Sequence, residues 1–171
     1  MTPEQRLREL GIDLPSPPKP VGAYVPAVLA GDLVFTAGQL PLRDGVMMCS
    51  GKVSSQVSLA DAQQAARQAA LNALAAARSV LASLDRVEQV VRLNVFVNSA
   101  AGFTEQAKVA NGASELMAEV FGQAGRHTRC AVGVAELPLD APVEVDLVLR
   151  VRDNAFAATP PIDLATEKPA Q

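Results

Sequence analysis

An alanine-rich stretch between residues 60 and 82 constrains the fold more than any other feature of this sequence. Eleven of its 23 residues are alanine, and leucines recur among them at helical spacing. The preceding Ser58-Leu59-Ala60-Asp61 resembles a capping box, whose serine accepts a hydrogen bond from a backbone N–H in the first turn. The sequence therefore predicts a long helix from residue 58 to about Leu84, with a face of small side chains that can lie close to a sheet.

Five apolar runs predict the strands of that sheet, at residues 24–28, 33–36, 91–97, 129–135 and 143–151. Gly31-Asp32 marks a hairpin between the first two runs, and Pro26 places the first run at a sheet edge because proline lacks a backbone donor. A second helix is expected from about Phe103 to Phe121, where Gly122 ends it.

The resulting order, ββαβαββ, predicts one α+β domain over residues 21–151, with a mixed sheet and two main helices on one face. A length of 171 residues fits one such domain. Residues 1–20 are expected to form a short helix over residues 3–10 and a proline-rich linker. Residues 152–171, rich in alanine, proline, threonine and charged residues, are expected to be a mostly unpacked tail.

The alternation within the strands also assigns residues to the two sheet faces. Cys130, Val132 and Val134 are expected to point into the core. The opposite, non-core face is expected to carry Arg92, Asn94, Arg129, Ala131, Gly133, Glu144, Asp146 and Arg150. Such a mixed face can be solvated or covered by another copy of the chain, and periodicity does not choose between these two cases.

Composition and charge exclude several classes of protein. The net charge of −3 lacks the basic excess that binding to nucleic acid requires, and this disfavours nucleic acid as a partner. Two cysteines are too few for a disulfide framework, the N-terminus is charged, and no apolar run approaches a membrane span. We therefore expect a cytoplasmic protein without membrane contact. One histidine and two distant cysteines do not provide the usual zinc ligands, and neither a P-loop nor a dinucleotide motif occurs.

Two places in the sequence could carry chemistry. Arg129 begins a strand beside Ala131 and Gly133, which leave room for a carboxylate to bind its guanidinium; the alternative is an arginine paired with Glu144 or Glu136.

Asn111-Gly112 lies inside the second predicted helix at a cost of about 1 kcal/mol for the glycine. Either close helix packing at the glycine or a polar contact from the asparagine can explain this pair. No motif marks a Ser-His-Asp triad, and the sequence shows no orienting partner for His127.

Several segments together resemble the reactive intermediate deaminase family, RidA or YjgF, and in particular a divergent branch related to the L-PSP-type endoribonucleases. These segments are Val21-Gly22-Ala23-Tyr24, Phe35-Thr36-Ala37-Gly38-Gln39, Asn94-Val95-Phe96-Val97, Arg129-Cys130-Ala131-Val132, Leu137-Pro138 and Val143-Glu144-Val145. The resemblance spans roughly residues 20–151.

This resemblance implies a chorismate-mutase-like subunit, assembled as a homotrimer with the sheets inside and ligand clefts between neighbouring subunits. The implied catalytic residues are Arg129, which grips a substrate carboxylate, and Glu144, which positions the attacking water. The implied substrate-binding residues are Tyr24, Ala37, Gly38, Asn111 and Cys130. The implied reaction hydrolyses a 2-iminoacid to a 2-oxoacid and ammonia, without a metal or organic cofactor. Whether Arg129 and Glu144 meet within one chain or across an interface stays open.

The sequence departs from the better-characterised deaminases at three places around this site. Ala37 replaces a serine, Ala131 replaces a cysteine, and His127-Thr128 replace Pro-Ala. The pocket should therefore differ, and a non-catalytic module that binds small carboxylates is an alternative. An endoribonuclease or translation inhibitor is a third alternative, which the acidic chain and single histidine disfavour.

Overall fold

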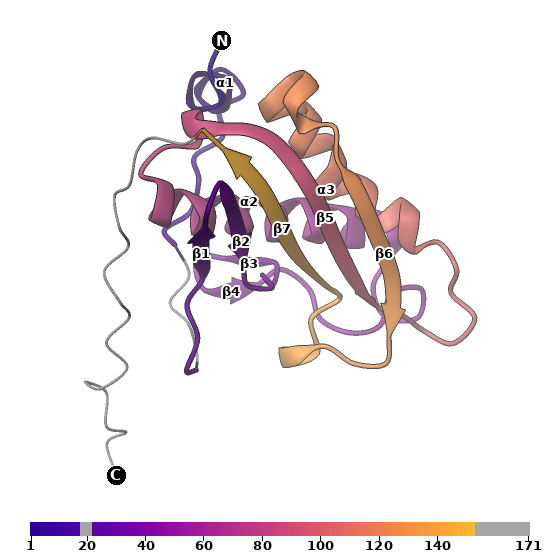
Figure 1. Ribbon diagram of the computed structural model, residues 1–171. Coiled ribbons are helices and arrows are strands. Elements are labelled where there is room, and N and C mark those ends of the chain that lie inside the picture. Colours follow the sequence, from indigo (N-terminus) through magenta and orange to yellow (C-terminus); the bar gives the residue numbers. More distant parts are fainter. Residues whose placement is uncertain (18–21, 153–171) are drawn as a thin grey trace.

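A five-stranded mixed sheet with two long helices on one face makes up the centre of the molecule (Figure 1). In this computed structural model, the structure describes residues 1–17 and 22–152. The strands lie in the order β1, β2, β7, β5, β6, with β5 and β6 parallel and the other neighbours antiparallel. Their bounds are Ala27–Ala30 for β1, Leu33–Thr36 for β2, Val143–Val151 for β7, Val87–Asn98 for β5 and Thr128–Val134 for β6.

Helix α2 (Leu59–Leu81) begins where the capping sequence predicts, because the Ser58 hydroxyl accepts a hydrogen bond from the backbone N–H of Asp61 at 3.1 Å. Helix α3 (Gln106–Phe121) packs beside it. The smaller elements are α1 (Pro3–Glu9), the hairpin β3 (Leu42–Arg43) and β4 (Val46–Met47), and the 3-10 turns η1 (Leu84–Arg86), η2 (Gly122–Gly125) and η3 (Pro138–Asp140). In the part of the chain that the structure describes, the helices are too short or too polar to cross a membrane.

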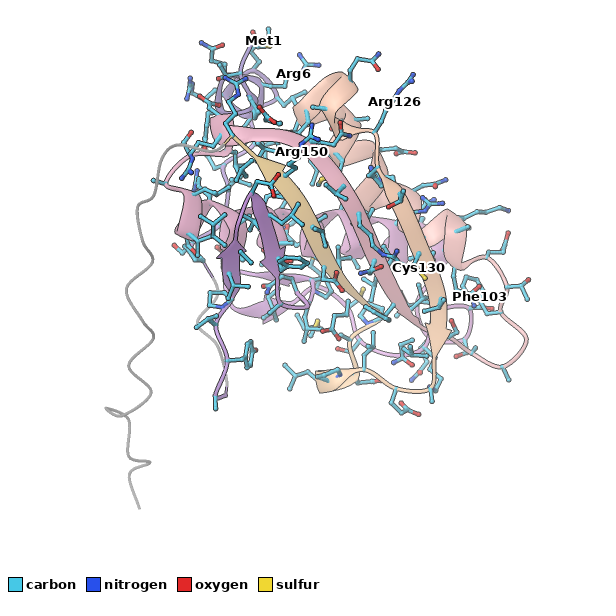
Figure 2. The ribbon with its side chains drawn as sticks, in the orientation of Figure 1. Met1, Arg6, Phe103, Arg126, Cys130 and Arg150 are labelled. Atoms are coloured by element: carbon cyan, nitrogen blue, oxygen red, sulfur yellow. The ribbon has the colours of Figure 1, made fainter. Side chains whose placement is uncertain are left out.

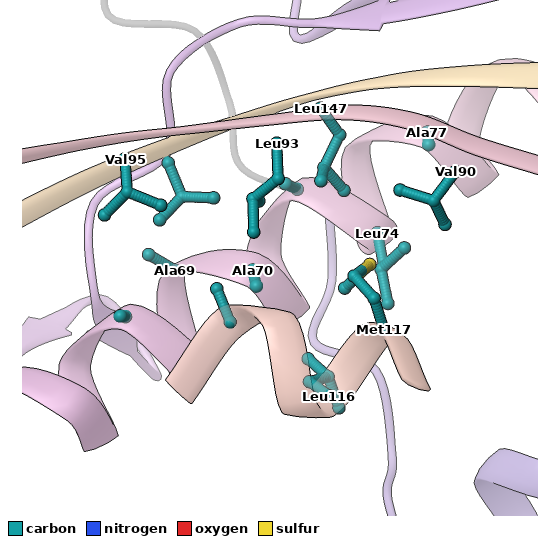
Figure 3. Close-up of a cluster of buried hydrophobic side chains, with 14 of the residues drawn as sticks. Ala69, Ala70, Leu74, Ala77, Val90, Leu93, Val95, Leu116, Met117 and Leu147 are labelled. Carbon is teal, nitrogen blue, oxygen red and sulfur yellow. The ribbon is translucent and has the colours of Figure 1, made fainter. Parts of the chain in front are cut away.

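The core lies between the sheet and these two helices (Figure 3). Alanines of α2 face branched side chains of β5 and β7, so the helix approaches the strands closely. At the α2–α3 contact, a Cβ added to Gly112 would lie 2.0 Å from the backbone oxygen of Gln63. Close packing therefore does require this glycine, as one of the two explanations for the Asn111-Gly112 pair predicts.

The predicted α+β fold with two main helices on one face is confirmed, and the largest differences lie at element ends. The first strand lies at 27–30 rather than 24–28, and β1 is an edge strand, as Pro26 predicts. The predicted strand 91–97 is the centre of a longer strand, and α3 starts three residues after Phe103. The β3–β4 hairpin was not predicted.

The N-terminal helix packs on the body instead of preceding it. Its Leu7 is buried in the core, and the Glu4 side chain accepts a hydrogen bond from the backbone N–H of Leu84 at 3.0 Å. The folded body therefore begins at α1 rather than near residue 21. Residues 18–20 of the predicted linker, Val21, and all of the predicted tail except Arg152 lie outside the described residues.

The predicted face assignment of β6 is wrong. The register pairs Arg129 with Leu93 and Gly133 with Val97, two buried residues of the helix-covered face. Arg129, Ala131 and Gly133 thus lie on the helix-covered face, whereas Cys130, Val132 and Val134 lie on the open face, because paired residues share a face. A period of two shows which residues share a face but not which face is buried. Here the small residues lie beneath α3, and Val132 remains 41% exposed on the other side.

Candidate functional site

Arg129 lies at the exposed edge of the sheet, where β6 passes α3. Its Nη1 donates hydrogen bonds to Asn111 Oδ1 at 2.9 Å and to Ser114 Oγ at 3.0 Å. Asn111 and Ser114 are three residues apart on α3, so both point from one helix face. The predicted polar contact from Asn111 is therefore present, in addition to the close packing at Gly112.

Arg129 has no carboxylate partner within ion-pair distance among residues 1–17 and 22–152. Glu136 instead pairs with Lys52, at 3.1 Å. The alternative in which Arg129 is a surface residue paired with Glu144 or Glu136 is thus wrong.

His127 adds two contacts that sequence reasoning missed. Its Nε2 lies 3.0 Å from Ser114 Oγ, and its Nδ1 lies 2.6 Å from the Gly125 carbonyl oxygen. His127 therefore does have an orienting partner, although this partner is a backbone carbonyl. Spacing indicates only the two pairs: Asn111 and Ser114 share a helix face, and His127 and Arg129 project to one side of an extended segment. It does not show that the helix and the strand bring the two pairs together. We call Asn111, Ser114, His127 and Arg129 the Arg129 half-site.

A second cluster surrounds Glu144 on the open face of β7. Backbone hydrogen bonds between Gln39 and Val145, at 2.8 and 3.0 Å, place the neighbouring Gly38 against the Glu144 side chain. A Cβ on Gly38 would lie 1.8 Å from Glu144 Oε1, so only glycine leaves the carboxylate where it is.

Tyr24 and Ala37 approach the same end of the sheet. The Ala37 backbone N–H donates to the Pro26 carbonyl at 2.9 Å, which joins the two segments, and Tyr24 is 51% exposed two residues earlier. We call Gly38 and Glu144, with the adjoining Ala37, the Glu144 half-site; Tyr24 lies at the same end of the sheet.

Burial raises the pKa of the half-buried Glu144 carboxyl, and the nearby Asp146 raises it further. Burial also raises the pKa of Asp146, opposed by the Asn94 amide, which donates a hydrogen bond to Asp146 Oδ1 at 2.7 Å, and by the charge of Arg92. In the described ranges, no basic side chain lies within ion-pair distance of Glu144. A carboxyl with a raised pKa and no cationic partner is suited to accept a proton from water near neutral pH.

The two half-sites do not meet within one chain. Glu144 pairs with Phe96, and Phe96 with Val132, so two strand spacings and three residues along the strand separate Glu144 from Arg129. This corresponds to roughly 14 Å between the two Cα atoms. The two side chains also point to opposite faces of the sheet.

Cys130 belongs to neither half-site. It lies in β6, beyond Arg126 along the chain (Figure 2). Its pairing with Asn94 places it on the open face, opposite to Arg129. A surface hollow of about 380 Å³ lies instead at the start of α2, lined by residues 54–59 with Phe103 and Glu105, and contains none of the predicted site residues.

Comparison with known proteins shows the family to which the chain belongs. Residues 4–150 match the family described as "YjgF/chorismate mutase-like, putative endoribonuclease". The chain belongs to the YjgF/RidA family. It is 46% identical over 148 residues to protein TCP17 of Trypanosoma cruzi, covering 86% of this chain and 92% of that protein. It is 30% identical over 139 residues to 2-iminobutanoate/2-iminopropanoate deaminase of Dermatophagoides farinae, covering 81% and 93%.

Two solved structures of similar proteins extend the family likeness to the fold. Protein Atu1372 of Agrobacterium tumefaciens, of unknown function, superposes with a TM-score of 0.81 at 42% identity, covering 88% of this chain and 92% of that one. Escherichia coli TdcF with bound serine superposes with a TM-score of 0.58 at 27% identity, covering 80% and 94%. The chorismate-mutase-like fold of the YjgF/RidA family is thereby confirmed.

Proposed function

We propose that this protein hydrolyses small 2-iminoacids to 2-oxoacids and ammonia, at clefts formed between the subunits of a homotrimer. The named relatives support this substrate class. One is a 2-iminobutanoate/2-iminopropanoate deaminase, and another binds serine, which like a 2-iminoacid carries a carboxylate next to a nitrogen-bearing carbon.

One observation carries the proposal: Arg129 and Glu144 are the two charged groups that the reaction needs, and each lacks an oppositely charged partner among the described residues. A planar guanidinium binds a carboxylate through two parallel hydrogen bonds. A half-buried carboxylate with a raised pKa is a suitable general base.

In the proposed reaction, Arg129 holds the substrate carboxylate while Glu144 accepts a proton from water. The water oxygen forms a bond to C2, and the C=N double bond becomes a single bond as its electron pair moves to nitrogen, which takes the proton that Glu144 accepted. Glu144 then accepts the proton of the new hydroxyl and passes it to the nitrogen, so that C2=O forms as the C–N bond breaks and ammonia leaves. One water is consumed, and no oxidant, reductant or metal is needed.

The proposed trimer brings the two half-sites together. In one chain they face opposite sides of the sheet, so a cleft that contains both needs a second copy. The open face also exposes Val28, Phe35 and Val132, each about 40% exposed. Such an apolar face favours association with further copies of the chain. Light scattering should give about three times the mass of the 17.8 kDa chain.

The direct test generates 2-iminopropanoate in the assay by an amino-acid oxidase acting on alanine, and follows pyruvate formation against spontaneous hydrolysis. We expect the parent protein to accelerate pyruvate formation and Arg129→Ala not to do so. A parent protein that binds pyruvate without accelerating hydrolysis would instead be a non-catalytic binding module.

A further inference from the structure

Three consecutive hydrogen bonds lead from the backbone carbonyl of Gly125 through His127 and Ser114 to Arg129. His127 Nδ1 lies 2.6 Å from the Gly125 oxygen, His127 Nε2 lies 3.0 Å from Ser114 Oγ, and Ser114 Oγ lies 3.0 Å from Arg129 Nη1. Neither His127 nor Ser114 belongs to the site that the family resemblance implies, and His127 stands where the better-characterised relatives have proline. These two residues therefore require an explanation of their own.

The direction of each hydrogen bond follows from chemistry. A carbonyl oxygen only accepts, so the proton between His127 and Gly125 resides on Nδ1. In the neutral imidazole, Nε2 is then the acceptor, and the Ser114 hydroxyl must donate to it. The serine oxygen is left with lone pairs that accept the N–H of Arg129. With the imidazole in its Nδ1–H tautomer, each of these three hydrogen bonds therefore has one donor and one acceptor.

This arrangement uses one nitrogen of the guanidinium completely. Nη1 carries two N–H groups, one directed to Asn111 Oδ1 and the other to Ser114 Oγ. The Nε and Nη2 donors form no hydrogen bond within residues 1–17 and 22–152. One edge of the guanidinium, made of Nε–H and Nη2–H, thus remains available for two parallel bonds to a carboxylate.

We propose that His127 and Ser114 are positioning residues that orient the guanidinium of Arg129, so that its Nε–Nη2 edge receives a ligand carboxylate. The role rests on the proposed function, because it concerns the same carboxylate. An exposed arginine otherwise samples many rotamers, and fixing one before binding increases affinity. The hydrogen bonds from Gly125 through His127 hold the Ser114 hydroxyl in place. Ser114 and Asn111 together then hold Nη1 of Arg129.

A role for Ser114 as a nucleophile agrees less well with these contacts. Its oxygen already accepts a hydrogen bond from a cation, which lowers the electron density that a nucleophile needs. The positioning role uses every contact that the structure places around this hydroxyl.

The test measures pyruvate affinity by titration calorimetry for the intact parent protein and five variants. Ser114→Ala should weaken binding about 10-fold, as expected for loss of one hydrogen bond to a charged group. His127→Ala should weaken it less, about 3- to 5-fold, because it acts through the serine. The double variant should be no weaker than Ser114→Ala alone.

His127→Gln should restore most of the affinity, since the glutamine oxygen can reach the former Nε2 position and accept the serine proton. Arg126→Ala is the matched control, since it removes a nearby positive charge that lies outside the hydrogen-bonded chain. At physiological salt its effect should stay within about 2-fold.

The imidazole provides a readout that does not depend on the ligand. His127 is the only histidine, so its ring nitrogens can be observed by ¹⁵N NMR without assignment. We expect the Nδ1–H tautomer in the parent protein and in Ser114→Ala, because the Gly125 carbonyl accepts this proton in both. A dominant Nε2–H tautomer would overturn the inference.

The binding outcomes separate this inference from the proposed function. A parent protein that binds pyruvate, with His127→Ala and Ser114→Ala binding equally well, overturns the positioning role alone. Additive losses in the double variant also overturn it, because His127 would then act independently of the serine. A parent protein that binds no small 2-oxoacid overturns the proposed function and, with it, the role of these residues.

Discussion

The two half-sites differ in how the fold prepares a charged group. Glu144 is half-buried on the open sheet face, and burial together with Asp146 raises its pKa. Arg129 is exposed at the sheet edge, and the hydrogen bonds that it donates to Asn111 and Ser114 hold its orientation. A proton acceptor needs a particular pKa, whereas a guanidinium is always charged and needs only a particular orientation.

The largest expected effect comes from removing the guanidinium. Arg129→Ala should lower kcat/KM for 2-iminopropanoate by about 10²–10³-fold, since the substrate carboxylate loses its charged partner. Arg129→Lys should not restore activity, because a point charge does not form two parallel bonds. Thermal melting should change by no more than a few degrees, because the side chain is exposed. Equal activity in Arg129→Ala and parent would show that Arg129 is structural.

Glu144→Gln tests the other half-site through chemistry rather than binding. It preserves the shape and removes the proton acceptor, so kcat should fall about 10²–10⁴-fold while pyruvate affinity stays nearly unchanged. Calorimetry and steady-state kinetics on one preparation separate the two effects. A variant that keeps its kcat but loses affinity would assign Glu144 to ligand binding.

A smaller effect is expected when the Glu144 carboxylate is moved instead of removed. In Gly38→Ala, the new Cβ would lie 1.8 Å from Glu144 Oε1, so the flexible carboxylate must shift. A shift of about 1 Å should lower kcat roughly 10- to 100-fold, with little change in stability. Adding Gly38→Ala to Glu144→Gln should cause no further loss, and an additive loss would mean that Gly38 acts elsewhere.

The smallest expected effect is on stability, and it depends on pH. The pKa of Glu144 is raised in the folded state, so this group favours folding below its unfolded-state pKa, and that contribution is lost as pH rises through the folded-state pKa. Glu144→Gln should therefore melt about 2 °C higher than parent at pH 8 and at the same temperature at pH 4. Glu115→Gln, which removes an exposed carboxylate from α3, is melted over the same pH range as the control.

A melting-temperature difference that is largest at pH 4 would contradict the raised pKa. A pH-dependent difference in melting temperature is expected for substitution of Glu144 and not for substitution of Arg129, because a guanidinium stays charged throughout this pH range.

The sequence predicted the architecture because its strongest signals are local. The alanine-rich helix, its serine cap and the alternation in β5 each depend on neighbours within a few residues. The family motifs also indicated Arg129, Glu144, Asn111 and Gly38, which the structure gathers into two clusters.

The face of β6 and the role of His127 could not be predicted in the same way. Both faces of β6 carry apolar residues, and only the pairing of Arg129 with Leu93 shows which of them α3 covers. The contact between Ser114 and His127 depends on where β6 crosses α3, which local patterns do not specify. The buried face of β6 and the contact between Ser114 and His127 thus depend on how helices and strands pack together, which the sequence pattern does not show.

Mixing two inactive variants tests most directly whether the half-sites combine across an interface. In Arg129→Ala the Glu144 half-site is intact, and in Glu144→Gln the Arg129 half-site is intact. Equal amounts co-refolded into random trimers should restore about one quarter of parent activity. Each cleft needs an intact Arg129 from one subunit and an intact Glu144 from its neighbour, and each of these has a chance of about one half. The two variants refolded separately and then combined provide the baseline. Activity that stays at this baseline in the co-refolded trimers would contradict the shared cleft and place the reaction within one chain.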